Sequence, residues 1–376
     1  MNTNKPQRLD SLQALRAIAF LSILTYHCGL MPAGPWAVTV FFVLSGFVMY
    51  YSSGRKERYP NTLSADVKFA VHHVSKLYPL HIIIMLVVII RESIKRGWFS
   101  QAWLRIAADA LLLTSWFPPQ LGLTSHSGVA WYLSTALFLY ACFGMIYRLL
   151  GRATPQKACG LMIGTYAAQV LFLCLLLCFT ELTEKTICWA SYEFPLFRLG
   201  DFFIGCCLGK VFIEKEECAR PCIPATVKET LCVVLIIGTM LIYVLKKGVL
   251  SIEPVRRSVL LLPSAAVTVY LFAEHKGKLT KLLTRPPLIW LASISGYGFL
   301  IHQEAIYQSK YFIFGPGAWG PSSQKVVILL VSFAVTILLS VIYMRITKWM
   351  RTLTSGSGCW RMMECGRNDR PRKRGR

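Results

Sequence analysis

Arg16 and His27 are the residues whose type and spacing most directly suggest chemistry. Both lie in the apolar stretch RLDSLQALRAIAFLSILTYH, residues 8–27, where a cation facing lipid is unfavourable by roughly 2.5–3.5 kcal/mol. Ten residues separate them, which is about 16 Å of helix and about 20° beyond three full turns. One helix face would therefore present a guanidinium and an imidazole to a polar interior. Alternatively, Arg16 snorkels to the cytoplasmic interface and His27 belongs to the outer one.

An imidazole in a polar interior is suited to general-base catalysis, because the ordinary pKa of histidine lies near neutrality. In acyl transfer, the base takes the proton of an acceptor hydroxyl while a cation or amide stabilises the oxyanion. The sequence has no G-x-S-x-G motif, and Ser45 has no base at a fixed spacing, which favours direct histidine-assisted transfer over a serine acyl-enzyme. No H-E-x-x-H, P-loop or paired-cysteine metal motif is present either, so no metal site is predicted.

The composition is that of a polytopic membrane protein. Of the 376 residues, 55% are hydrophobic and 16% are charged, whereas soluble domains carry about 25% charged residues. The net charge of +23 comes from Lys and Arg in short loops and at the termini, which is how membrane proteins set their orientation. We therefore expect an anionic membrane surface as the partner of this charge, and no nucleic acid. Most of the 13 cysteines lie in apolar runs, where Cys behaves as a small hydrophobe.

The apolar runs predict an all-α bundle of about ten transmembrane helices. Residues 106–116 are too short to span and suit a re-entrant or interfacial segment. Counting them would give eleven crossings, but ten places most basic loops and both termini in the cytoplasm, as the positive-inside rule requires. Two basic segments, residues 91–105 and 246–257, remain outside against that rule. We expect a membrane domain over residues 8–347 and a basic, disordered cytoplasmic tail over residues 348–376, in a multi-pass protein of the plasma or inner membrane.

Three residues of later helices reach the level of His27 near the outer face on this topology, namely Trp131, Arg198 and His302. An arginine, an aromatic residue and two histidines in one layer would make a credible reaction site. Each also has a structural interpretation. Trp131 could belong to an aromatic belt, and His302 could be a satisfied polar group at a helix end. Arg198 could pair with Asp201, one turn further on.

Six ordered sequence blocks resemble the integral-membrane acyltransferase 3 family, and together they cover roughly residues 8–347. The first carries the family's mark, an Arg and a His separated by ten residues. The blocks are LDSLQALRAIAFLSILTYH, WAVTVFFVLSGFVMYY, HHVSKLYPLHIII, AWYLSTALFLY, PLFRLGDFFIGCCLGK and ISGYGFLIHQ. Each block alone is weak, whereas the ordered set is specific.

The resemblance implies a ten-helix enzyme that takes acetyl or other short acyl groups from a cytoplasmic thioester, with acetyl-CoA or a similar acyl-CoA as a substrate and no bound cofactor. Acceptors in such a family are hydroxyls of cell-envelope glycans, exported polysaccharides or small hydrophobic molecules. It also implies that His27 is the catalytic base and that Arg16 is its partner on the donor side. The substrate-binding residues that it suggests are Lys76, Trp131, Ser134, Arg198, Tyr297 and His302.

The chain departs from the family pattern at two places. Ala136 and Leu137 stand where many members have acidic residues, and His73 and Lys76 stand where arginines are common. Lys76 is either a donor-binding residue or a positive anchor, and it lacks the bidentate fork of Arg. A transporter or flippase of a charged or glycan substrate is the alternative function, although the sequence shows no internal repeat. A non-catalytic membrane subunit would instead tolerate substitution of His27.

Overall fold

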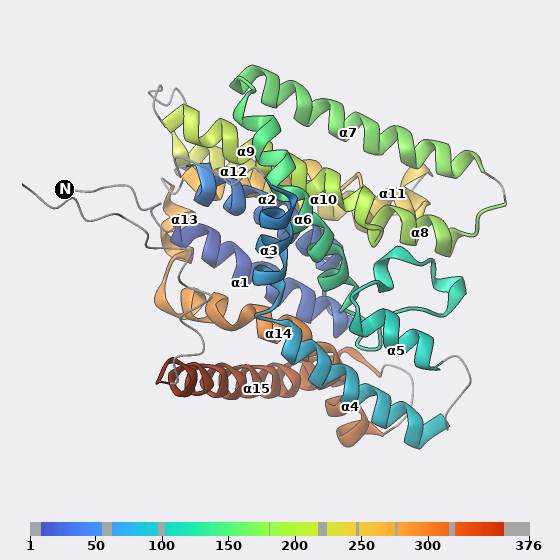
Figure 1. Ribbon diagram of the computed structural model, residues 1–376. Coiled ribbons are helices and arrows are strands. Elements are labelled where there is room, and N and C mark those ends of the chain that lie inside the picture. The colour runs from blue at the N-terminus through green and yellow to red at the C-terminus, as the bar shows by residue number, and fades with distance from the viewer. Residues whose placement is uncertain are drawn as a thin grey trace, which may run out of the picture.

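A computed structural model describes residues 9–54, 62–96, 102–179, 181–216, 224–245, 248–274, 277–315 and 320–356, and within these ranges the chain is helical with no β-strand. The longer helices lie side by side, with α1 in the middle of the bundle and α7 and α15 at opposite edges of the view (Figure 1). The helices are α1 (Asp10–His27), α2 (Gly34–Gly54), α3 (Leu63–Val74), α4 (Tyr78–Arg96), α5 (Ala102–Ala110), η1 (Thr114–Trp116), η2 (Pro119–Leu121), α6 (Trp131–Gly151), α7 (Pro155–Cys178), α8 (Glu184–Tyr192), α9 (Pro195–Glu216), α10 (Ala225–Leu245), η3 (Gly248–Ser251), α11 (Glu253–Arg257), α12 (Leu262–Glu274), α13 (Lys278–Leu283), α14 (Pro286–Phe314) and α15 (Ser322–Gly356).

Among the described residues, six helical segments are long and apolar enough to cross a membrane: α2, α6, α7, α10, α11 with α12, and α15. The bent pair α3 and α4, which meet at 56°, would make a seventh. Helices α1, α9 and α14 are also long enough but are less apolar. They contain the predicted site residues Arg16, Arg198 and His302 together with other polar residues, such as Asp201, Lys210 and Glu304. The ten-helix count and the cytoplasmic termini stay predictions.

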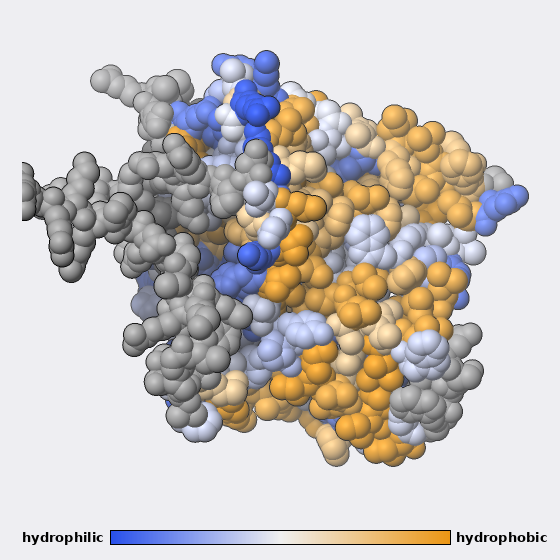
Figure 2. Space-filling view, in the orientation of Figure 1, coloured by the Kyte–Doolittle hydropathy of each residue, from blue (hydrophilic) through white to orange (hydrophobic). Residues whose placement is uncertain are grey.

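The surface between the two ends of the bundle is largely hydrophobic, and hydrophilic residues gather mainly toward the end where the N-terminus lies (Figure 2). Helices α7, α10 and α15 contribute many exposed large apolar side chains. Such a continuous apolar surface is typical of a face covered by lipid.

The segment predicted to be short is short. Helix α5 has nine residues, which is about 14 Å of helix and less than half of a bilayer core. At the other terminus, α15 continues to Gly356 and so includes the first part of the expected tail. Residues 357–376 lie outside the described residues.

Helices α2 and α9 cross very closely, and glycines allow this. A Cβ on Gly46 would lie 2.0 Å from the carbonyl oxygen of Phe202, and a Cβ on Gly205 would lie 2.0 Å from that of Val43. Only glycine fits such a backbone approach. The thiol of Cys206 also donates to the carbonyl oxygen of Gly46, at 3.4 Å. This crossing fixes the position of the start of α9 relative to α1 and α2.

Helix α1 is enclosed by α2, α12 and α14. Its apolar side chains are buried, whereas Arg16 and His27 are half-buried. The two polar residues therefore point into the bundle at different depths, as their spacing predicts.

Short elements close the end of the bundle where α1 ends (Figure 1). Three polar contacts hold them in place. The carboxylate of Asp109 accepts hydrogen bonds from the backbone N–H of His126, at 2.8 Å, and from its ring Nδ1, at 2.9 Å. The hydroxyl of Ser134 donates to the carbonyl oxygen of Leu112, at 2.5 Å. Leu112 has a φ of +56°, a strained conformation for a side-chain-bearing residue that surrounding contacts must maintain.

Candidate active site

His27 is the last residue of α1 and lines a cavity of about 140 Å³ at the closed end of the bundle. The cavity brings together residues from α1, α2, α6, α8, α11, α14 and the segments that precede α6 and α9. Its lining consists of Ile23, Tyr26, His27, Gly34, Val38, Gly128, Val129, Trp131, Tyr192, Glu193, Arg257 and Phe299. An imidazole, a carboxylate, a guanidinium and phenol groups thus share one small space.

The side-chain amide of Gln303 lies beside the His27 ring, with its nitrogen position 3.4 Å from Nδ1. Amide oxygen and nitrogen are assigned from their hydrogen bonds. When the oxygen accepts from Nδ1–H, Nε2 is left unprotonated and can take a proton. Gly128 makes room for this amide, because a Cβ there would lie 2.4 Å from Oε1 of Gln303. Gly128 also has a φ of +66°, which favours glycine.

His302 lies next to His27 but does not line the cavity. The two ring centroids are 5.2 Å apart. His302 is fully buried, and its Nδ1 is 2.7 Å from the carbonyl oxygen of Phe299, to which it donates. Its Nε2 has no hydrogen-bond partner among the described residues. His302 thus packs against the His27 ring behind the wall of the cavity.

Trp131 begins α6 and lines the same cavity as His27. Its ring packs on Tyr192, with centroids 5.3 Å apart, and on Phe42, at 6.3 Å. These rings give the cavity apolar walls beside its polar groups. Of the residues suggested as substrate-binding, Trp131 is the one that shares the cavity with His27.

Arg198 forms the ion pair with Asp201 that its spacing allowed. It is fully buried. Its Nε donates to the carbonyl oxygen of Tyr192, at 2.6 Å, and Nη1 donates to Oγ1 of Thr39, at 3.3 Å. Gln169 completes the cluster by donating to the carboxylate of Asp201, at 2.9 Å. Arg198 therefore fixes Tyr192, a wall of the cavity, without lining the cavity itself.

The remaining predicted residues lie elsewhere. Ser134 is buried, and its hydroxyl bonds to Ser115, at 2.7 Å, as well as to Leu112. Tyr297 packs against Tyr343 of α15, with ring centroids 5.1 Å apart. Lys76 is exposed at the bend between α3 and α4.

Arg16 occupies a second level, away from the cavity. It interacts electrostatically with Tyr132 and Tyr140, whose hydroxyls both lie near Ser45. Between this level and His27 lies an aromatic layer, which we define as Phe41, Tyr132 and Phe299. Their ring centroids are 5.0–6.2 Å apart, and Phe299 also lines the cavity. The guanidinium and the imidazole thus stand on either side of packed rings.

Sequence reasoning did not single out two charged residues of the cavity, Glu193 and Arg257. Glu193 is only the first residue of an expected apolar span, residues 193–211, and Arg257 ends a connecting segment, and neither lies in one of the family-like blocks. One signal did point toward Arg257. It ends a basic segment, residues 246–257, that the ten-helix topology places outside against the positive-inside rule. An arginine that lines a cavity inside the protein is not a loop charge that sets orientation, so the positive-inside rule does not apply to it.

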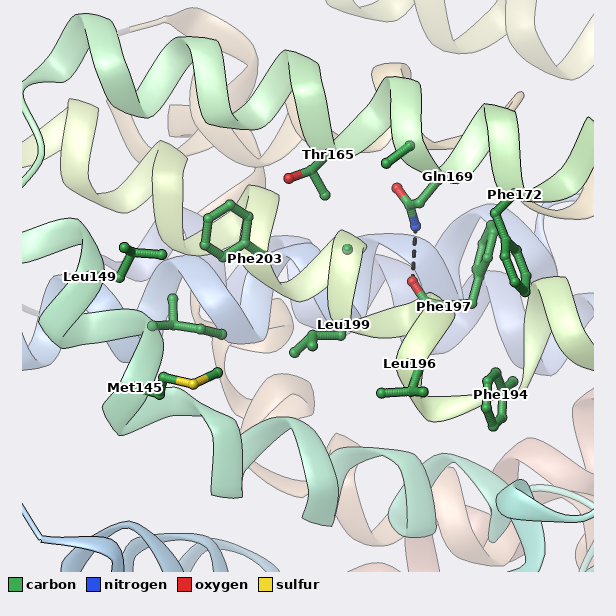
Figure 3. A pocket seen from close by; sticks show the side chains of 13 residues that line it. Met145, Leu149, Thr165, Gln169, Phe172, Phe194, Leu196, Phe197, Leu199 and Phe203 are labelled. Carbon is green, nitrogen blue, oxygen red and sulfur yellow. Dashed lines mark hydrogen bonds between the residues drawn. The ribbon is translucent and has the colours of Figure 1, made fainter.

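A larger cavity, of about 620 Å³, lies between α6, α7 and α9 and is lined mainly by apolar side chains, including Met145, Phe172 and Phe203 (Figure 3). None of the described residues that line it is titratable, and it shares no lining residue with the cavity of His27. Its one amide, Gln169, donates to the carbonyl oxygen of Phe197 at 3.0 Å (Figure 3). The groups capable of proton transfer are therefore in the smaller cavity. Over the described ranges, no three His, Cys, Asp or Glu side chains form a group that could hold a metal ion.

Comparison with known proteins agrees with the block pattern. Over 182 residues the chain is 27% identical to the acyltransferase MdmB of Streptomyces mycarofaciens. The aligned region covers 43% of this chain and 45% of that protein. Over 88 residues it is 34% identical to protein 2 in the picA locus of Rhizobium radiobacter, and this aligned region covers 22% of this chain and 45% of that protein. The chain thus matches about half the length of these relatives. No solved structure matches.

The family comparison spans nearly the whole chain. The model of the acyltransferase domain called Acyl_transf_3 matches residues 9–345. This range contains α1 with Arg16 and His27, every other wall of the cavity, and most of α15. The chain therefore belongs to the acyltransferase 3 family of integral membrane proteins.

Proposed function

We propose that this protein is a plasma- or inner-membrane acyltransferase that moves an acetyl or other short acyl group from an acyl-CoA-type donor to a hydroxyl of a cell-envelope or exported carbohydrate. The observation that carries the proposal is the position of His27. Its imidazole lines a small polar cavity at the end of α1, and Gln303 can hold its Nδ1. This is the arrangement that a general base for a hydroxyl acceptor needs.

The reaction requires one proton to move twice. Nε2 of His27 takes the proton of the acceptor hydroxyl as its oxygen bonds to the carbonyl carbon of the thioester. The resulting tetrahedral oxyanion collapses, the carbon–sulfur bond breaks, and the thiolate takes the proton from the imidazolium. The products are an ester and free CoA thiol, so no serine or cysteine intermediate is needed.

Arg16 is proposed to act on the donor side. It lies eleven helical steps before His27, or about 16 Å along α1. A guanidinium at that depth suits the phosphates or the carbonyl of an incoming acyl-CoA. Lys76, exposed at the bend before α4, can contribute to the same side as a point charge. The acceptor then reaches His27 from the opposite side of the membrane.

Envelope glycans of cells carrying the wild type, His27→Ala or no copy test the proposal. Mass spectrometry should detect an alkali-labile acyl increment with the wild type alone, and the mass of the increment names the acyl group. The loss in His27→Ala should be 100-fold or more, since general-base assistance contributes about 10²–10⁴-fold.

His72→Ala is the matched control, because His72 is an exposed histidine of α3. It should retain the increment, and the membrane level of each variant is measured by immunoblot. An increment that survives His27→Ala would rule out His27 as the base. An increment absent from all strains, including in assays with purified protein and acetyl-CoA, would contradict acyl transfer to a glycan.

A further inference from the structure

Glu193 and Arg257 line the His27 cavity, and the mechanism above gives neither a role. Glu193 lies in the turn between α8 and α9, and Arg257 is the last residue of α11. Two oppositely charged groups beside a catalytic base are in the position to bind the molecule whose hydroxyl reacts.

The backbone around Glu193 is held firmly, whereas its carboxylate is not. Its carbonyl oxygen accepts from Oγ1 of Thr135, at 2.8 Å, and Arg198 donates to the preceding carbonyl of Tyr192, at 2.6 Å. No described residue donates a hydrogen bond to the carboxylate. Burial raises the pKa of Glu193 to about 7, although Arg257 and Arg198 act in the opposite direction. The hydroxyl of a ligand can supply the missing donor.

The guanidinium of Arg257 is anchored but keeps capacity for a ligand. Nη1 donates to the carboxylate of Glu253, at 3.0 Å, and Nη2 donates to the hydroxyl of Tyr26, at 3.3 Å. The group also lies over the ring of Tyr192, 4.8 Å from its centroid. Its Nε has no acceptor within the described ranges. Arg257 is therefore a fixed hydrogen-bond donor on the cavity wall.

The charge balance of the cavity disfavours an anionic ligand. Glu253 compensates Arg257, and Asp201 compensates Arg198. Glu193 is then the carboxylate that none of the described residues pairs with directly. A phosphate or a uronic acid would meet this carboxylate and be repelled. An uncharged hydroxyl can instead donate to Glu193 while a neighbouring hydroxyl accepts from Arg257.

We propose that the cavity binds an uncharged, polyhydroxylated acceptor, such as a neutral sugar residue, with Glu193 and Arg257 holding neighbouring hydroxyls so that one hydroxyl meets His27. The rings of Trp131 and Tyr192 provide apolar surfaces for the C–H face of the sugar. The cavity volume of about 140 Å³ is below the roughly 300–1,000 Å³ of sites that enclose a whole small molecule. It therefore takes one end of the acceptor. This inference rests on the proposed acyl transfer and specifies its acceptor.

Saturation-transfer NMR on the full chain in lipid nanodiscs tests the inference without any acyl donor. The probes are methyl glycosides of several neutral hexoses and the corresponding methyl uronides. The wild type should bind one or more neutral glycosides at least tenfold more tightly than their uronides. Glu193→Gln should weaken neutral binding by about tenfold, since a hydrogen bond to a charged group is lost, and should reduce the discrimination against uronides. Arg257→Gln should weaken neutral binding, and Arg257→Lys should weaken it less.

Glu184→Gln is the matched control, because Glu184 is an exposed acid at the start of α8. It should bind as the wild type does. Equal or tighter binding of the uronides by the wild type, binding of no neutral glycoside, or unchanged preference in Glu193→Gln would overturn the inference. His27→Ala separates the two proposals. It should abolish acyl transfer while keeping the preference for neutral glycosides, so either proposal can fail while the other holds.

Discussion

Two side chains that do not line the cavity, Gln303 and His302, contact the ring of His27. Gln303 reaches Nδ1, and the ring of His302 packs at a tilt against that of His27, with centroids 5.2 Å apart. His302 in turn is fixed by its hydrogen bond to Phe299. Since a base acts only when the correct nitrogen is free, these supports decide the tautomer as much as the position of the base.

Gln303→Leu should lower kcat/KM for the acceptor by about 10–100-fold, because the tautomer with a free Nε2 loses its stabilising acceptor. Gln303→Glu should retain most of the activity, since a carboxylate also accepts from Nδ1–H. Steady-state kinetics with a soluble acceptor glycoside measures both variants. Equal activity of Gln303→Leu and the wild type would mean that Nδ1 needs no acceptor from this residue.

Glu193 predicts a pH dependence of acceptor binding. Its pKa is about 7 in the empty cavity, and a bound hydroxyl that donates to the carboxylate favours the charged form. Binding should therefore tighten as pH rises through about 7 and weaken below it. The charged and titratable groups facing Glu193 are Arg257, Arg198, Tyr192, Tyr26, Cys188 and His27. Dissociation constants of a neutral glycoside between pH 5.5 and 8.5 measure the effect, which Glu193→Gln should remove. A slope that persists in Glu193→Gln would assign the titration to another group.

Residues of the cavity could be predicted from the sequence where a polar or aromatic side chain stood out in an apolar run. His27 and Trp131 interrupt or begin long apolar runs, and both line the cavity. Glu193 and Arg257 could not be found in this way, because Glu193 stands at the edge of an apolar run and Arg257 ends a connecting segment. Their place beside His27 depends on how α8 and α11 pack at the end of the bundle, which no local pattern encodes.

At the scale of single elements, the close crossing of α2 and α9 is the contact on which the cavity depends. Gly46→Ala should lower the thermal unfolding temperature and the membrane yield, because the added Cβ would lie 2.0 Å from the carbonyl oxygen of Phe202. Overpacking of this kind destabilises by about 1–3 kcal/mol. Gly160→Ala on α7 is the matched control, since no heavy atom lies within 4 Å of its added Cβ. Similar unfolding temperatures for the two variants would show that the crossing can relax.

Ser134 belongs to the same scale, since it joins α6 to the strained Leu112. Ser134→Ala should lower stability by about 1–3 kcal/mol through the lost hydrogen bonds, with little change in acceptor KM. Ser293→Ala, at an exposed serine of α14, serves as the control in thermal unfolding and kinetics. A large rise in acceptor KM with unchanged stability would instead assign Ser134 to substrate binding.

The helical elements were predictable because long apolar runs dominate the sequence. The short helix α5 was predictable because the apolar run at residues 106–116 has too few residues to span a bilayer. The helix ends around the site were less so. Residues 8–27 read as one span, but the sequence does not say that the chain then turns so that α2 begins beside Tyr26. Nor does the i, i+3 spacing of Arg198 and Asp201 decide between an ion pair and a ligand contact, since both need the same side chain.

At the scale of the whole molecule, the aromatic layer separates two compartments of the bundle. Arg16 lies near Tyr132 of the layer and near Tyr140, and His27 lies in its cavity beside Phe299 of the layer. The large apolar outer surface (Figure 2) places both compartments within one membrane-embedded body. In the proposed mechanism, an acyl group that enters beside Arg16 passes this layer to reach the acceptor at His27.

The separation of Arg16 from His27 predicts that the two substrates are used from opposite sides of the membrane. Right-side-out vesicles containing the protein should acylate an impermeant external glycoside only when acyl-CoA is enclosed within them. External acyl-CoA should give at least tenfold less product, because the phosphates of CoA cannot cross the bilayer or the small cavity of His27. Mass spectrometry of the external glycoside measures the product.

Vesicles carrying His27→Ala provide the background, and detergent permeabilisation provides the positive control, since it gives both substrates access to both sides. Under detergent, external acyl-CoA should restore the product to the level seen with enclosed acyl-CoA. Equal product from external and enclosed acyl-CoA in sealed vesicles would place both binding sites on the same side. That result would contradict the two-level arrangement, because the layer of Phe41, Tyr132 and Phe299 would then not lie on the path of the acyl group.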